Sequence, residues 1–209
     1  MTPAVSRLPA LLTAESRGRV EPLARTAAEK RYWVVINTRQ GGLRGWIAEA
    51  AHYVIGEPLE SWVDGAVTAA WLAAWGRGEG SFPADHVFVE ISSPDGWLAI
   101  SAVETADVLR QRCLHWAVAL GRDGDWLAVP PLGCVLHDGT AALDPLLGEE
   151  RIVAILRTAL DVLASLSTRL ATGGVALEAR EKPVKMPKTL IQTRPGELLV
   201  NEWVSVMLK

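Results

Sequence analysis

The 209-residue chain has only two cysteines, two phenylalanines, two tyrosines and four histidines. Two cysteines in a chain of this length cannot form the disulfide framework of a small secreted domain. No stretch approaches the roughly 18–20 consecutive apolar residues that a membrane-spanning helix needs. The N-terminal segment has only the short apolar run 8–12, which is too short for a secretory signal. We therefore expect a protein of the cytoplasm, or of a virion assembled there, without a membrane partner.

Neither sign of charge is in large excess, since the net charge is −3 and charged residues make up 22% of the chain. This balance excludes a globally basic surface for nucleic acid or anionic lipid. Apolar residues are abundant, at 49%, and nine of them are tryptophan. The chain is long enough to bury a sizeable core in one domain with an appendage.

Hydrophobic periodicity divides the chain into helical and extended segments. Helical spacing predicts helices over 21–30, 43–55, 61–75, 105–120 and 149–171. β-branched, aromatic or alternating residues predict strands over 32–38, 86–92, 97–103, 125–129, 133–137, 175–180 and 198–208. The second and third of these strands flank a Ser-Pro-Asp-Gly turn and predict a hairpin.

The order of these segments predicts the fold class. Two adjacent helices followed by a hairpin break the regular alternation of a βαβ fold. We expect an α+β fold with a mixed, mainly antiparallel sheet, four to five helices and an extended C-terminal arm. The domain organisation expected is an irregular leader over 1–20, a single α+β domain over 21–181, and an extended basic arm with a terminal strand over 182–209.

The arm holds four of the five lysines in the chain. Lys182, Lys185 and Lys188 recur every third residue between prolines, which would line them along one edge of a polyproline II helix. Such an edge suits a phosphate backbone or an acidic protein surface, although a solvated linker has the same composition. The strand that follows can pair within its own sheet or with a neighbour's exposed edge. The sequence leaves both alternatives open.

Protein interfaces are indicated by the apolar helix 61–75 and by the tryptophans. A helix that is apolar nearly all round is buried on more than one side, in a core or an interface. Tryptophan near the end of an element is a common interface anchor. The interface candidates are Trp75, Trp97, Trp203, Leu198 and Val200.

Two Cys-His pairs supply the ligand types that zinc prefers. They are Cys113 with His115 and Cys134 with His137. The spacings CxH and CxxH differ from those of common zinc motifs. On the helix predicted over 105–120, positions 113 and 115 would also point about 200° apart. The pattern therefore favours core cysteines, and no cofactor is expected.

A catalytic or ligand-binding site is indicated only weakly. His86 and Glu90 share one face of a predicted strand, as a pair for acid–base chemistry would, but a solvated strand face has the same pattern. The glycine-rich loop 41–45 precedes a predicted helix and could hold an anion at the helix N-terminus. It lacks the spacing of a nucleotide-binding fingerprint. The sequence leaves open whether the chain is an enzyme, and it favours a non-catalytic protein.

Without a convergent catalytic set, we expect a non-catalytic structural or interaction subunit of a larger assembly, such as a bacteriophage particle or a bacterial machine. It would pack on other protein subunits, in a homo- or hetero-oligomer, through its tryptophan-rich helices and its arm. One alternative is a nucleic-acid-associated protein that uses Arg39, Arg44 and the three arm lysines. A second alternative is a small enzyme or ligand binder around His86 and Glu90.

Overall fold

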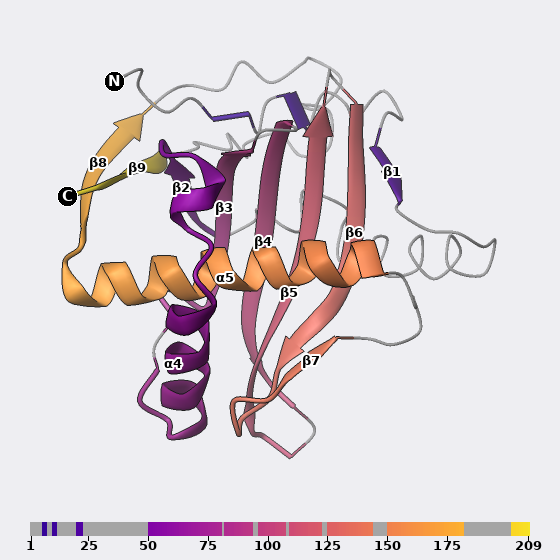
Figure 1. The fold of residues 1–209 in the computed structure, drawn as a ribbon, viewed down its shortest axis with the longest axis vertical. Helices are drawn as coiled ribbons and strands as arrows, with labels where there is room; N and C mark the ends of the chain where they lie inside the picture. The colour runs from indigo at the N-terminus through magenta and orange to yellow at the C-terminus, as the bar shows by residue number, and fades with distance from the viewer. Residues whose placement is uncertain are drawn as a thin grey trace, which may run out of the picture.

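A nine-stranded sheet, crossed by one long helix, dominates the structure (Figure 1). The structure is a computed structural model, which describes residues 6–7, 10–11, 20–22, 50–80, 82–93, 96–107, 109–122, 125–143, 150–181 and 202–209. The strands are β1 Val20–Pro22, β2 Ala51–Ile55, β3 His86–Ser93, β4 Gly96–Ala106, β5 Arg112–Arg122, β6 Asp125–Val135, β7 Ala141–Leu143, β8 Val175–Glu181 and β9 Glu202–Leu208. The helices are the short 3₁₀ helix η1 Leu59–Ser61, α4 Gly65–Gly76 and α5 Glu150–Thr172.

The strand order is β1-β6-β5-β4-β3-β2-β9-β8, with β7 paired to β6. Strands β3 to β6 follow one another as a meander of antiparallel neighbours. Parallel pairs join β1 to β6, β2 to β3 and β2 to β9. The sheet is therefore mixed and mostly antiparallel.

Several predicted elements are confirmed. β3 and β4 form the predicted hairpin, and β8 occupies the strand predicted at 175–180. α5 matches the helix predicted over 149–171. α4 corresponds to the helix predicted over 61–75 but starts later, because the Asp64 carboxylate caps it by accepting from the backbone N–H groups of Ala66 and Val67.

The prediction of four to five helices is wrong, because the described part of the chain contains two α-helices and is dominated by its sheet. Segment 43–55, predicted as a helix, ends in strand β2, and 105–120 contains the start of the long strand β5. The segment 21–30, predicted as a helix, begins with the last residues of strand β1. The strand predicted over 32–38 lies outside the described residues.

The prediction of a helix over 105–120 failed for a physical reason. Alternate residues of β5 face opposite sides of the sheet, and both sides are largely buried. Leu114, Trp116 and Val118 face α5, whereas Ala117 and Ala119 face away and are buried too. A strand covered on both faces is a nearly continuous apolar run without visible alternation. Its sequence therefore resembles that of a buried helix.

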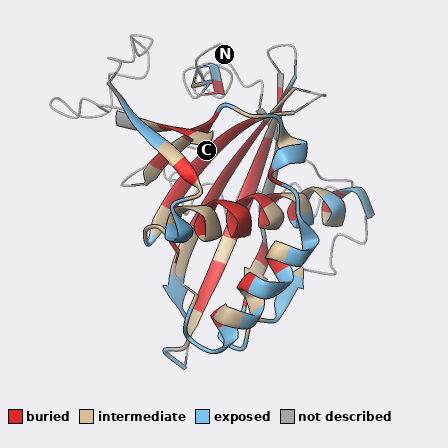
Figure 2. Cartoon of the chain, turned by 60° about the vertical axis from the view of Figure 1, so that its left-hand side comes forward, coloured by how far each residue is buried: buried red, intermediate tan, exposed pale blue. Residues whose placement is uncertain are grey.

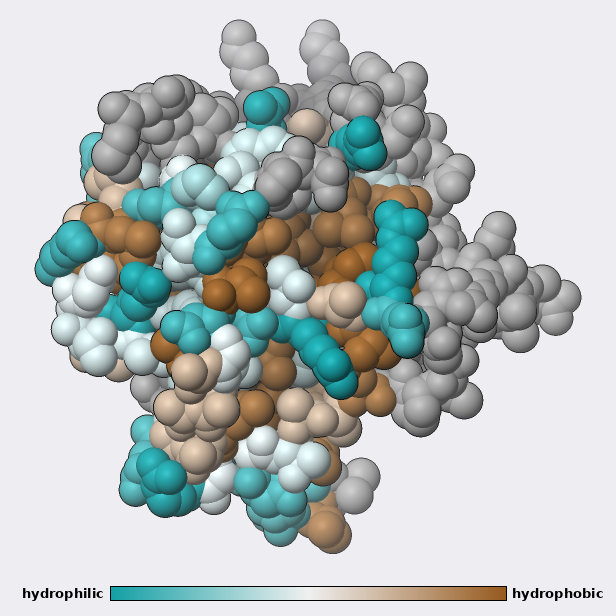
Figure 3. All heavy atoms as spheres, in the orientation of Figure 1, coloured by the Kyte–Doolittle hydropathy of each residue, from teal (hydrophilic) through white to brown (hydrophobic). Residues whose placement is uncertain are grey.

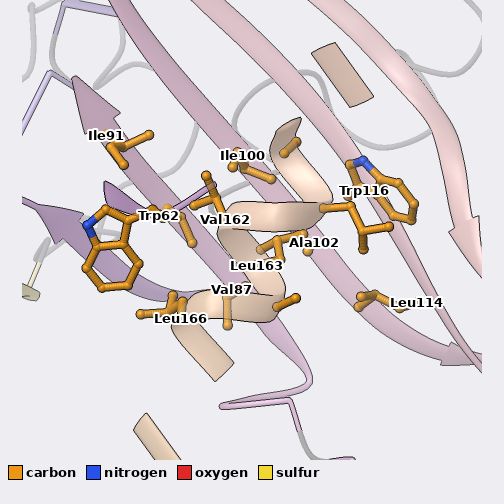
Figure 4. Packing of buried hydrophobic residues seen from close by; sticks show 14 of the residues in the cluster. Trp62, Val87, Ile91, Ile100, Ala102, Leu114, Trp116, Val162, Leu163 and Leu166 are labelled. Atoms are coloured by element: carbon orange, nitrogen blue, oxygen red, sulfur yellow. The ribbon is translucent and has the colours of Figure 1, made fainter. Parts of the chain in front are cut away.

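The main core lies between the sheet and α5 (Figure 4). Val162, Leu163 and Leu166 of α5 are buried against strands β3, β4 and β5. Each such side chain stabilises the fold by roughly 1.5–3 kcal/mol relative to exposure. α4 packs beside α5, where the Trp71 indole N–H donates to the Ser167 hydroxyl at 3.1 Å. Figure 2 shows buried residues along the strands and on the adjoining side of α5.

The face of the sheet that points away from α5 is also buried in the middle. Phe88 and Glu90 of β3 lie there and are 1% and 2% exposed. Ser101 of β4 is their buried neighbour across the antiparallel ladder. This face carries the polar and metal-ligating side chains of the sheet, and the candidate site lies on it.

The contact of Gly133 with the Trp116 ring supports a first prediction. A Cβ atom at Gly133 would lie 2.2 Å from Cε2 of Trp116. The ring is buried and donates its N–H to the Leu156 carbonyl at 3.1 Å, so it cannot move aside without losing that bond. We expect Gly133→Ala to lower the free energy of unfolding by about 1–3 kcal/mol, measured by chemical denaturation. Gly65→Ala is the matched control, because a Cβ at Gly65 meets nothing within 4 Å.

A Gly133→Ala protein as stable as the Gly65→Ala control would contradict the packing of Trp116 over β6.

Candidate metal centre

Cys113, His115 and Cys134 form a cluster on the face of the sheet that points away from α5. Their ligating atoms all lie within 4.8 Å of one another. Cys113 and His115 belong to β5, where residues two apart point to the same face. Register pairs His115 directly with Cys134 on β6. The helix predicted over 105–120 would have separated the first two residues, and the strand brings them together.

The distances from the imidazole nitrogen to the two sulfur atoms fit a tetrahedral zinc ion. The Nε2 atom of His115 lies 3.4 Å from the Cys113 sulfur and 3.9 Å from the Cys134 sulfur. Tetrahedral coordination with ordinary Zn–S and Zn–N bonds places sulfur and nitrogen about 3.6 Å apart. Both sulfur–nitrogen distances are within a few tenths of an ångström of that value.

The protonation of the cluster is set mainly by burial. The pKa of the Cys134 thiol is raised to about 11, chiefly by burial, with smaller contributions from the neighbouring Cys113 and from the charge of Asp107. Burial lowers the pKa of His115, which favours the neutral imidazole that metals bind. The Thr105 hydroxyl lies 3.1 Å from the Cys113 sulfur and can support a thiolate there. At neutral pH, an ion that binds must therefore displace the Cys134 proton.

A disulfide is a less suitable use of the same cysteines, which are both free. Because His115 is directly opposite Cys134, Cys113 is a diagonal neighbour of Cys134 across the ladder. Diagonal neighbours lie about 7–8 Å apart, whereas the Cα atoms of a disulfide are usually about 4.4–6.8 Å apart. The strand geometry favours a bridging ion over a direct sulfur–sulfur bond.

The structure brings together three of the four predicted metal ligands. His137 is exposed in the turn after β6 and is not part of the cluster. The predicted acid–base pair is not brought together either. His86 contacts the Ser101 hydroxyl at 3.1 Å, whereas Glu90 contacts His52.

A buried polar cluster that the sequence did not reveal lies elsewhere on this face. The Glu90 carboxylate contacts the His52 Nε2 at 2.6 Å and accepts from the Ser6 hydroxyl at 2.6 Å. Its other oxygen accepts from the Arg7 backbone N–H at 2.5 Å. The Arg7 guanidinium lies 5.1 Å from the centre of the Trp97 ring. Only the parallel pairing of β2 with β3 reveals that His52 is the partner of Glu90.

The interface candidates occupy different environments. Trp75 is 1% exposed, and the Arg112 guanidinium lies 3.6 Å from its ring centre, so it packs inside the chain. Trp97 is half-buried beside Arg7. Trp203 belongs to β9, which pairs with β2 and β8 of the same chain. The terminal strand of the arm thus completes the protein's own sheet.

The remaining predicted site residues lie outside the described part of the chain. They are Leu198, Val200, Lys182, Lys185, Lys188, Arg39, Arg44 and the loop 41–45. The interface and nucleic-acid roles assigned to them stay predictions.

No family model, curated protein or solved structure matches this chain. Among the described residues, no helix has the length and apolar character needed to cross a membrane. The function is therefore argued from the chemistry of the site.

Proposed function

We propose that this protein binds a zinc-class metal ion through Cys113, His115 and Cys134. The observation that supports the proposal is the close approach of two sulfur atoms and one imidazole nitrogen, all within 4.8 Å. Thiolate and imidazole ligands favour zinc over magnesium and calcium, which prefer oxygen. The metal would join neighbouring strands β5 and β6 and would stabilise the folded chain by binding it in preference to the unfolded one.

The test is metal stoichiometry and affinity for the full chain and its ligand variants. We expect one Zn²⁺ ion per chain, measured by elemental analysis and by competition with a chromogenic chelator. Cys134→Ser and His115→Gln should each weaken binding by at least about 100-fold, because even the loss of an outer-shell partner commonly costs 10–100-fold. His137→Gln is the matched control and should bind as the wild type does, since His137 lies outside the cluster.

The proposal fails if the wild-type chain binds no zinc, or if the ligand variants retain wild-type affinity. Weakening by His137→Gln as large as that of His115→Gln would mean that a different set of residues holds the ion.

The second candidate function is that of an interaction subunit, which the exposed side of α4 favours. Ala66, Ala69 and Ala73 are exposed on this helix, and its surface is tan to white, not teal, in Figure 3. A hollow of about 320 Å³ lies beside it, lined by residues of both α4 and α5. Exposed apolar surface of this kind suits a protein partner. The arm does not add support, because β9 pairs within its own chain.

Light scattering tests this second candidate. We expect the wild-type chain to form a defined oligomer and Ala69→Glu to form a monomer, because a charge on the exposed side of α4 would oppose burial. Glu150→Gln, on the exposed first turn of α5, is the control and should leave the mass unchanged. A monomeric wild-type chain at micromolar concentration would count against self-assembly.

A further inference from the structure

The proposed metal site has three ligands, whereas zinc sites are usually four-coordinate. In the described part of the chain, no fourth histidine, cysteine or carboxylate atom joins the cluster. This leaves one coordination position to be explained. The inference that follows rests on the proposed metal binding.

Asp107 is the acidic group to consider for that position. It lies in the turn between β4 and β5, where its Oδ1 accepts from the backbone N–H groups of Leu109 and Gln111 at 2.8 Å each. It follows Thr105 by two positions, at the end of β4, and the Thr105 hydroxyl lies 3.1 Å from the Cys113 sulfur, so Asp107 is next to the part of the sheet that holds the cluster. Its charge also contributes to the raised pKa of Cys134. Its oxygens nevertheless lie outside the group of mutually close ligand atoms. Asp107 is therefore placed as an outer neighbour.

The burial of the three ligands gives the cluster a closed side and a more open side. Cys113 is buried, whereas His115 and Cys134 are each partly exposed. A small molecule can approach past the two partly exposed residues. Metal sites with three protein ligands and one accessible position typically hold water there, and the metal lowers the pKa of that water.

We propose that the fourth position is taken by an exchangeable water molecule, which donates a hydrogen bond to the Asp107 carboxylate. Small monodentate donors such as thiocyanate would displace this water in a simple ligand exchange, in which one metal–oxygen bond breaks and one metal–ligand bond forms. The centre would then be of the open type, able to bind an exogenous ligand, and would not be a closed structural site.

The Co²⁺-loaded full chain tests the proposal, because cobalt bound to thiolates has a charge-transfer absorption and its visible bands report coordination. We expect a cobalt–thiolate spectrum that thiocyanate shifts saturably, with one thiocyanate per metal. Asp107→Asn keeps the Oδ1 acceptor of the turn, so it should fold and bind Co²⁺ within about threefold of wild type. It should bind thiocyanate about three- to tenfold more tightly, because a like charge next to the anion is removed.

Different failures have different meanings. A cobalt–thiolate spectrum that thiocyanate does not change would show a closed fourth position, which overturns this inference and leaves the metal site standing. Loss of Co²⁺ affinity by about 100-fold in Asp107→Asn would identify Asp107 as a ligand and would also overturn it. Absence of any thiolate absorption with Co²⁺ would overturn both the inference and the proposed function.

Discussion

Replacing His52 with leucine is expected to lower the free energy of unfolding by about 3–5 kcal/mol. The His52 and Glu90 side chains are only 6% and 3% exposed, and their contact distance is 2.6 Å. Leucine fills much of the same volume but removes one of the three contacts of a buried carboxylate that also accepts from Ser6 and Arg7. The measurement is urea unfolding in the presence of a chelator, so that metal binding does not contribute.

Two further variants separate a lost partner from a poor fit of the new side chain. The double variant His52→Leu/Glu90→Leu should recover at least about half of the loss, because removing both side chains of the pair costs less than leaving Glu90 buried without its His52 contact. Glu79→Gln breaks an ion pair with Arg77 whose side chains are 61% and 58% exposed, and it should leave stability unchanged within error. A His52→Leu chain as stable as Glu79→Gln would contradict the buried pair.

Raising the pH from about 6.5 to about 8.5 is expected to increase the apparent affinity for Zn²⁺ by about 100-fold through Cys134 alone. The Cys134 thiol has a pKa of about 11, raised chiefly by burial. It is therefore protonated across this range in the metal-free chain, and each binding event must release its proton. Affinity rises with pH because the released proton competes with the ion. His115 does not oppose this trend, since burial lowers its pKa and keeps it neutral.

Calorimetry in two buffers with different ionisation enthalpies counts the protons released, and competition with a chelator of known pH dependence gives the affinities. Cys134→Ser is the matched control. It should release one proton fewer, and its weaker affinity should depend less steeply on pH. An affinity that stays constant or falls over this range would show that the Cys134 thiolate is not a ligand.

The residue types of the proposed metal site could be read from the sequence, but their geometry could not. Two cysteines and two histidines are of the types that bind zinc, but their spacing favoured core cysteines; in the structure, three of the four are close together. The helix predicted over 105–120 was the obstacle, because only a strand puts Cys113 and His115 on one face. Cys134 is nineteen positions from His115 and meets it through the ladder of β5 and β6. No spacing rule within a single segment predicts that register.

The arm shows a similar limit. The apolar character of 198–208 predicted a strand, and β9 lies there. Whether this strand pairs within its own chain or with a neighbouring molecule depends on which strand edges are free. In the structure, β2 pairs with β3 along one edge and with β9 along the other, both in parallel. That choice is set by long-range pairing, which a local pattern does not encode.

By itself the sequence determined the elements whose signals are local. These elements are helix α5 with its long apolar stripe, the turn between β3 and β4, and strand β8. The signal for each comes from residues only a few positions apart. Only the tertiary structure decided that β5 is a strand, that His52 pairs with Glu90, and that two cysteines and a histidine converge. The reason is that burial on both faces of a sheet removes the alternation that marks a strand, and what covers each face is decided by the fold as a whole.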